Sequence, residues 1–146
     1  MQNNFTNGLL HFLLNSHKLF QLVEGITGCG PIGSFEGRVY RVVPGQGHHD
    51  GWHSDMVDCR LVAISINLSE EIYSGGILQI RERNVEKFLH EVANVGFGDA
   101  ILFRVADQLV HRITEVTGEA SKTAFAGWFK SQPSFLSLLK GSSTAL

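Results

Sequence analysis

The stretch that decides the fold is RLVAISINL, residues 60–68, because alternate residues in it are of two different kinds. In an extended strand, successive side chains point to opposite faces. One face would carry large aliphatic side chains: Val62, Ile64, Ile66 and Leu68. The other would carry small or polar ones: Ala63, Ser65 and Asn67. The stretch therefore predicts a strand that packs against a core on one side and lines a site on the other.

Seven further stretches are predicted to be strands, separated by turns rich in glycine: 37–43, 49–55, 76–82, 91–95, 99–105, 109–116 and 121–130. The last of them has the same two-sided character. Lys122 and Trp128 share one side with Ala124 and Ala126, so that two alanines leave space beside the lysine. Many short strands in succession favour an antiparallel jelly-roll or barrel over alternating β and α units. We expect a mainly β protein.

The N-terminal part is predicted to be helical up to about residue 30. Ser16 can cap a helix that ends near Gly25 or Gly28, and residues 9–14 form a separate short helix. With 146 residues, one domain is expected. Within 1–146 we expect helical support over 1–30, a jelly-roll core over 36–130 and a tail over 131–146.

Composition argues against several classes of partner. The net charge of −2 and the charged fraction of 18% give no field that attracts nucleic acid or acidic lipid. The richest apolar run, 9–14, is broken by His11 and too short to cross a bilayer, and the start lacks the basic residues of a signal peptide. Cys29 and Cys59 are too few for a disulfide framework. We expect a cytoplasmic protein with free thiols, without a nucleic-acid or membrane partner.

Three side chains, distant in the sequence, form a candidate metal site. His53 and Asp55 can point to the same side of a strand, and His111 could come from a later strand. Two imidazoles and one carboxylate on one face of a metal suit a non-haem Fe(II) ion and leave coordination positions open for chemistry. Lys122 would add a cation nearby. Core packing explains Trp52 and Trp128, whereas Arg60 could reach a substrate carboxylate or form an exposed ion pair.

The order of several short motifs points to a known family. These are Pro44-Gly45, His53-Ser54-Asp55, Ile66-Asn67-Leu68, Ser74 to Leu78, Gly98 to Phe103, His111, and Lys122 to Trp128. From Tyr40 to Trp128 the chain resembles the Fe(II)/2-oxoglutarate-dependent oxygenases, specifically the prolyl-hydroxylase-like class. The resemblance implies a double-stranded β-helix (jelly-roll) core, with one or two N-terminal helices packed on it. It also implies iron ligation by His53, Asp55 and His111.

The resemblance further implies how the co-substrate is held. The family places a basic residue on the last strand to pair with the distal carboxylate of 2-oxoglutarate, and Lys122 occupies that place, six residues before the tryptophan. The family usually has arginine there, and a lysine is a point charge that needs further donors. Relatives often carry a hydroxyl residue at the position of Ala124 and a tyrosine at the position of Ser65. Ser65, Tyr40 and Thr123 are therefore the candidate helpers.

The implied activity is that of an Fe(II)- and 2-oxoglutarate-dependent dioxygenase. It would use O2 to hydroxylate a C–H bond of an amino-acid or peptidyl (prolyl-type) substrate and release succinate and CO2; the substrate class rests on analogy. One alternative is a non-catalytic jelly-roll binding module. Another is a cupin-like metalloenzyme that does not use 2-oxoglutarate, although residues 47–55 lack the cupin motif. A nucleic-acid demethylase is disfavoured because Lys122 and Trp128 replace its two arginines. The sequence does not indicate an oligomeric state.

Overall fold

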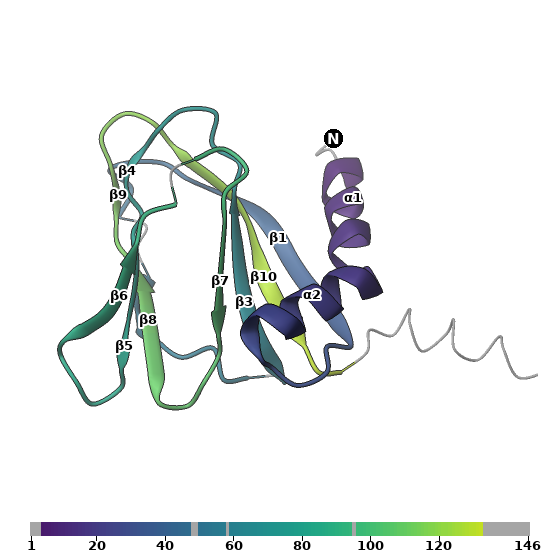
Figure 1. The fold of residues 1–146 in the computed structure, drawn as a ribbon. Coiled ribbons are helices and arrows are strands. Elements are labelled where there is room, and N and C mark those ends of the chain that lie inside the picture. The colour runs from purple at the N-terminus through teal and green to yellow at the C-terminus, as the bar shows by residue number, and fades with distance from the viewer. Residues whose placement is uncertain (1–3, 48–49, 58, 95, 133–146) are drawn as a thin grey trace, which may run out of the picture.

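The protein has two helices followed by short antiparallel strands in the computed structural model, which describes residues 4–47, 50–57, 59–94 and 96–132 (Figure 1). The elements are α1 (Asn4–Leu14), α2 (His17–Thr27), β1 (Ser34–Val42), β2 (Asp50–His53), β3 (Arg60–Asn67), β4 (Ser74–Gly75), β5 (Leu78–Glu82), β6 (Phe88–Val92), β7 (Ala100–Arg104), β8 (Leu109–Ile113), β9 (Val116–Thr117) and β10 (Lys122–Lys130). Neither helix is long and apolar enough to cross a membrane.

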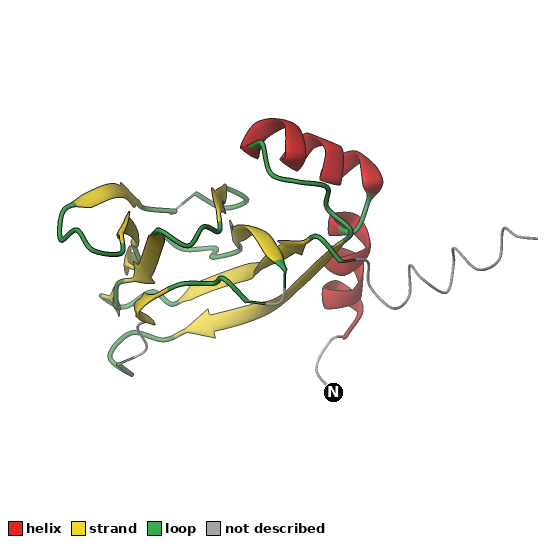
Figure 2. Ribbon diagram, turned by 90° about the horizontal axis from the view of Figure 1, so that it is seen from below, coloured by secondary structure: helices red, strands yellow, loops and turns green. Residues whose placement is uncertain are grey.

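Two four-stranded antiparallel sheets face each other. The large sheet has the order β1-β10-β3-β7 and the small sheet β2-β8-β5-β6, while β4 and β9 form a short pair of their own. Apart from the β5–β6 hairpin, successive strands of the two four-stranded sheets switch from one sheet to the other, as in a jelly-roll. In Figures 1 and 2 both helices lie on the outer side of the large sheet. The predicted mainly β jelly-roll with N-terminal helices is confirmed.

Several predicted boundaries were wrong by a few residues. The predicted strand 76–82 begins only at Leu78 in β5, because Gly75 and Gly76 adopt left-handed backbone angles (φ +73° and +60°) that separate it from the short strand β4. The predicted strand 109–116 is divided into β8 and β9, α1 begins at residue 4 rather than 9, and β6 begins at 88 rather than 91. Of the predicted tail, residues 133–146 lie outside the described part of the chain.

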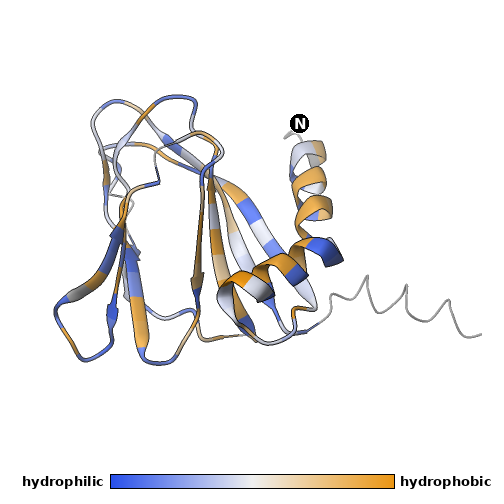
Figure 3. Cartoon of the chain, in the orientation of Figure 1, coloured by the Kyte–Doolittle hydropathy of each residue, from blue (hydrophilic) through white to orange (hydrophobic). Residues whose placement is uncertain are grey.

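The hydrophobic core lies between the large sheet and the helices. Phe129 packs against Phe35 at 5.0 Å between ring centroids and edge-on against Phe20 of α2 at 6.0 Å. Val62 of β3 is fully buried in the same cluster, as the alternation in 60–68 predicted. Figure 3 shows the apolar residues on these strands and on both helices. Because this face is filled, the opposite face of the large sheet is available to line a site.

The helices are fixed to the sheet by polar contacts as well as by packing. As predicted, the Ser16 hydroxyl accepts a hydrogen bond from Leu19 N–H, and α2 ends at Gly28, whose φ is +63°. Asn15, just beyond α1, bonds both backbone groups of Phe35 (2.9 and 3.1 Å), and the His11 ring bonds the Gly37 carbonyl (2.7 Å). These contacts occupy part of the free edge of β1, which would otherwise be open to pairing with another strand.

Candidate metal centre

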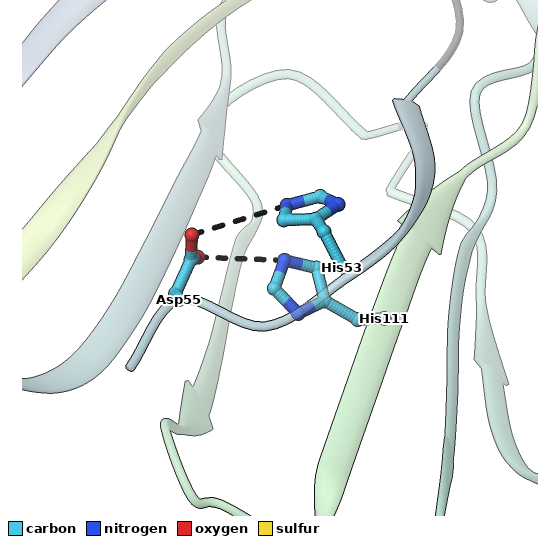
Figure 4. A group of neighbouring side chains, drawn as sticks. All are labelled: His53, Asp55 and His111. Carbon is cyan, nitrogen blue, oxygen red and sulfur yellow. Dashed lines mark ion pairs between the residues drawn. The ribbon is translucent and has the colours of Figure 1, made fainter. Parts of the chain in front are cut away.

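The two candidate histidine ligands are placed by strand pairing. His53 is the last residue of β2, and His111 is the central residue of β8. The two are direct cross-strand partners, so their rings lie on the same face of the small sheet with centroids 4.3 Å apart. Asp55 is not part of the strand, contrary to the predicted strand 49–55, but it lies two residues beyond it and turns its carboxylate toward both rings (Figure 4).

The three side chains converge on a small space. Asp55 Oδ2 is 3.4 Å from His111 Nε2, and Asp55 Oδ1 is 3.9 Å from His53 Nε2. One ligand atom from each residue lies within 4.8 Å of the others, and this is the one such group found in the described part of the chain. The side chains of Asp55 and His111 are 9% and 11% exposed, whereas 40% of the His53 side chain is exposed. The donor set suits a ferrous ion approached from the His53 side.

Hydrogen bonds around the ligands fix their orientation. The His53 Nδ1 position bonds the Gly51 carbonyl at 2.7 Å, which directs Nε2 toward the other ligands. The Trp128 indole N–H donates to Asp55 Oδ2 at 2.7 Å, and Arg60 Nη1 donates to Oδ1 at 3.3 Å. Trp128 and Arg60 therefore contact the metal centre: core packing does not fully account for Trp128, and the ion pair of Arg60 is with the candidate ligand Asp55 rather than at an exposed site. The placement of Trp128 on the same side of β10 as Lys122 was the available signal.

Burial keeps the His111 imidazole in its ligand form. Desolvation lowers the pKa of His111 most strongly, the nearby Asp55 carboxylate raises it, and His53 lowers it further. The Phe103 and His111 rings pack in a T-shaped arrangement with their centroids 4.8 Å apart, which contributes to the desolvation. A lowered pKa leaves His111 neutral at pH 7, with a nitrogen lone pair available for a metal ion.

A buried lysine lies on the same cavity as the metal centre. Lys122 is 3% exposed, and its Nζ donates to the Gly76 carbonyl at 3.0 Å. The Tyr73 ring centroid lies 5.5 Å away. No carboxylate of the described residues forms an ion pair with Lys122, and burial lowers the pKa of Lys122, partly offset by the more distant Asp50. A buried cation with only a neutral acceptor is suited to binding an anionic ligand.

The cavity has a volume of about 860 Å³ and brings most of the predicted site residues together. His53, Asp55, His111, Lys122, Tyr40 and Ser65 all line it. Burial raises the pKa of Tyr40, and the Ser65 side chain partly offsets this effect. Thr123 does not line the cavity. It follows Lys122 directly in β10, so its side chain lies on the opposite face of the sheet.

Two residues of this region were not predicted from the sequence. The Tyr73 hydroxyl donates to the Asn94 carbonyl, and Asn94 Nδ2 donates to the Ser65 carbonyl at 3.2 Å. Burial raises the pKa of Tyr73 to about 12, so the hydroxyl remains a donor. Both residues lie between strands, where no periodic pattern marks them. They fix the cavity wall next to Ser65 and Lys122.

Comparisons with known proteins agree with this geometry. The family model described as "2OG-Fe(II) oxygenase superfamily" matches residues 37–130, whereas a search of curated protein sequences gave no match. A prolyl-4-hydroxylase from Pseudomonas putida is similar in structure, with a TM-score of 0.60 and 21% identity over 80% of this chain and 62% of that one. An oxidoreductase of the 2OG-Fe(II) oxygenase family from Burkholderia pseudomallei is also similar in structure, with a TM-score of 0.63 and 14% sequence identity over 87% of this chain and 56% of that one.

A third solved structure is a prolyl hydroxylase from Trichoplax adhaerens in complex with a peptide fragment of the hypoxia-inducible-factor oxygen degradation domain. It gives a TM-score of 0.55 and 18% identity over 86% of this chain and 56% of that one. The chain thus spans less than two thirds of the length of each of these structures. The match over 37–130 confirms the resemblance seen in the sequence, together with the predicted Fe(II), 2-oxoglutarate and O2. The chain belongs to the 2OG-Fe(II) oxygenase superfamily.

Proposed function

We propose that this protein is an Fe(II)- and 2-oxoglutarate-dependent hydroxylase of an amino-acid or peptidyl, prolyl-type substrate, with succinate and CO2 as co-products. One observation carries the proposal. A single cavity is lined both by a group of two imidazoles and one carboxylate and by a buried lysine that has no carboxylate partner among the described residues. The first suits ferrous iron and the second suits a carboxylate, and 2-oxoglutarate is a ligand that needs both.

Each residue has a role in the proposal. His53, Asp55 and His111 hold the iron, which when bound supplies the activation of O2 that is coupled to oxidation of the keto acid. Lys122 neutralises the distal carboxylate of 2-oxoglutarate. The hydroxyls of Tyr40 and Ser65 line the same cavity and add the hydrogen bonds that a lysine alone does not provide. Thr123 has no part, because it does not line the cavity.

The substrate class is supported by the position of the opening. His53 is the most exposed of the three ligands, so a substrate would reach the iron along its side of the cavity. Exposed residues of β1, including Glu36 and Arg38, line the cavity too and offer polar contacts to a peptide. The similar Trichoplax adhaerens structure contains a bound peptide fragment. We therefore infer a peptide or a small amino-acid substrate rather than a nucleic acid.

The direct test is formation of succinate from 2-oxoglutarate by the purified chain with Fe(II), O2 and a reductant. Free proline, proline-containing peptides and other amino acids should be added in turn. We expect slow succinate release without substrate and faster release with one of these classes. Binding of 2-oxoglutarate without succinate in any mixture would favour the non-catalytic binding module, and no binding at all would contradict the proposal.

Gly76→Ala is expected to weaken 2-oxoglutarate binding about tenfold, as loss of about 1–2 kcal/mol does. A Cβ on Gly76 would lie 3.0 Å from the Tyr73 ring and 3.2 Å from Lys122 Cδ, and the φ of +60° strains any L side chain. The substitution thus displaces both the lysine stem and the carbonyl that holds its ammonium group. The measurement is isothermal titration of 2-oxoglutarate into the Mn(II)-loaded protein.

Gly28→Ala is the matched control for that variant. Gly28 has nearly the same φ, +63°, but a Cβ there would meet nothing within 4 Å. We expect a similar loss of thermal stability from backbone strain in both variants. Only Gly76→Ala should lose affinity for 2-oxoglutarate. Equal affinities in the two variants would show that Gly76 does not position Lys122.

A further inference from the structure

We infer that Trp128 is a positioning residue of the metal centre, whose indole N–H holds the Asp55 carboxylate in its ligand orientation, and that Arg60 in turn holds the indole. The inference rests on the proposed function, since it concerns how this chain prepares the same three ligands for iron. It assigns a role in metal affinity to Trp128 and a supporting role to Arg60, neither of which offers a ligand atom.

Asp55 needs an anchor that the two histidines do not need. His53 and His111 are held by direct pairing of β2 with β8. Asp55 lies beyond the end of β2, in a turn closed by the bonds Val57 N–H to Asp55 C=O (2.7 Å) and Arg60 N–H to Val57 C=O (3.1 Å). These bonds fix the backbone of the turn but leave the rotation of the carboxylate free. A side-chain contact must set that rotation.

The Trp128 indole supplies this contact. Its N–H donates to Asp55 Oδ2 at 2.7 Å, and the same oxygen lies 3.4 Å from His111 Nε2. A carboxylate oxygen has two lone pairs. With one lone pair engaged by the indole, the other remains on the side of the imidazoles, where a metal ion would bind. The hydrogen bond therefore selects the rotation in which Asp55 completes the ligand set.

Trp128 is itself rigidly placed. It lies in β10, an inner strand of the large sheet, and pairs with Glu36 of β1 on one side and Ala63 of β3 on the other. The Arg60 guanidinium covers the indole ring at 3.7 Å from the ring centroid, a favourable cation–π distance. The bond from Trp128 to Asp55 thus ties the turn after the small-sheet strand β2 to the large sheet, next to the metal centre.

Arg60 acts mainly through the indole. Its Nη1 also contacts Asp55 Oδ1, at 3.3 Å, a longer and weaker bond than that from Trp128. As a cation, Arg60 opposes the approach of Fe(II) to the carboxylate, so its charge does not favour metal binding. Its stacking on Trp128 keeps the indole from rotating away. The residue that increases metal affinity is therefore Trp128.

Trp128→Phe tests this role, because it keeps an aromatic ring and removes the indole N–H together with the five-membered ring that carries it. Loss of the hydrogen-bonding partner of a metal ligand typically costs about 10–100-fold in metal affinity, and we expect a loss of that size. The readout is the dissociation constant of Mn(II), by isothermal titration of the full chain without 2-oxoglutarate. This measurement does not depend on turnover.

Trp52→Phe is the matched control. Trp52 is the chain's other tryptophan and, like Trp128, it lies under arginine: Arg81 at 4.2 Å and Arg112 at 4.8 Å. It precedes His53 in β2 and so faces away from the ligands. We expect Mn(II) affinity within twofold of wild type. Without metal, both variants should unfold at similar temperatures, but the rise in Tm on adding Mn(II) should be reduced only in Trp128→Phe.

The outcomes separate the inference from the proposed function. Mn(II) affinity of Trp128→Phe within twofold of wild type would overturn the inference and leave the function intact, whereas failure of the wild-type chain to bind Mn(II) would contradict the function first. If Trp128→Phe does not fold, the inference is tested instead by NMR of the indole N–H protons in the wild-type protein. We expect the Trp128 proton to be protected from solvent exchange and to shift with Zn(II); rapid exchange would overturn the inference.

Discussion

Lys122→Met is expected to weaken 2-oxoglutarate binding by about 100-fold or more without lowering thermal stability. Breaking a buried charge pair by removing one partner costs about 3–5 kcal/mol, and each 1.4 kcal/mol is a factor of ten in affinity. The unliganded protein, in contrast, has a lysine that is 3% exposed and that bonds only the Gly76 carbonyl through its ammonium group. Methionine fills a similar volume without a buried charge. The measurements are 2-oxoglutarate titration and thermal unfolding at pH 7.

The lowered pKa of Lys122 predicts how the stability difference between Lys122→Met and wild type changes with pH. Burial lowers the pKa of Lys122 below its ordinary value of 10.5, so the charged form is disfavoured in the folded protein. Burying the charged lysine therefore destabilises the fold. This destabilisation is fully present below the lowered pKa of the folded protein and disappears as the pH rises from there to 10.5, the ordinary pKa of lysine. The stability advantage of Lys122→Met should therefore be largest near neutral pH and shrink in alkaline buffer. In wild type, 2-oxoglutarate affinity should fall over the same alkaline range.

Lys130→Met is the control for the loss of a lysine from β10. Lys130 ends the same strand and forms an ion pair with Glu36 at 2.7 Å, but it does not line the cavity. Because 64% of the Glu36 side chain is exposed, the pair contributes little to stability. We expect unchanged 2-oxoglutarate affinity in this variant. A Lys122→Met protein with the affinity of Lys130→Met would show that the buried lysine is not the carboxylate site.

The second large effect is expected for His111→Ala, which should reduce succinate release to the level seen without metal. The substitution removes one of the three ligands, and its effect on Fe(II) or Mn(II) affinity should exceed the roughly 10–100-fold typical of residues that only support a ligand. His111 lies in the middle of β8, so the alanine variant should keep its strand pairs. The measurements are metal titration and succinate release from 2-oxoglutarate.

His90→Ala is the control for that variant. His90 is exposed on β6, in the same sheet, opposite Ile80 of β5. We expect metal affinity and succinate release like those of wild type. Metal-dependent succinate release by His111→Ala at the wild-type rate would rule out His111 as an iron ligand.

The parts of the site that the sequence predicted are those placed by strand periodicity. The alternation in 60–68 placed Ser65 on the cavity and Val62 in the core, and both placements are confirmed. The same alternation explains why Lys122 lines the cavity and Thr123 does not: the two are neighbours in β10, so their side chains point to opposite faces of the sheet. His53 and His111 meet because β2 pairs with β8, an association that the sequence suggested through motif order rather than through any local pattern.

The contacts that the sequence did not predict depend on how the two sheets close on each other. Trp128 meets Asp55 across 73 residues of chain, and the tryptophan has an equally good local explanation as a packing residue. Tyr73 and Asn94 come from segments between strands, where side-chain direction follows no period. His11 bonds the edge of β1 only because α1 lies along that strand. Each of these roles arises from tertiary packing rather than from local propensity.

The most direct test of the central claim is an anaerobic titration of the full chain with Fe(II) and then 2-oxoglutarate, followed by visible absorption. Chelation of a keto acid to ferrous iron gives a charge-transfer band. We predict that the band appears in wild type only when both reagents are present, is absent in His111→Ala, and needs a much higher 2-oxoglutarate concentration in Lys122→Met. Wild-type protein that develops no band at saturating Fe(II) and 2-oxoglutarate would contradict the account.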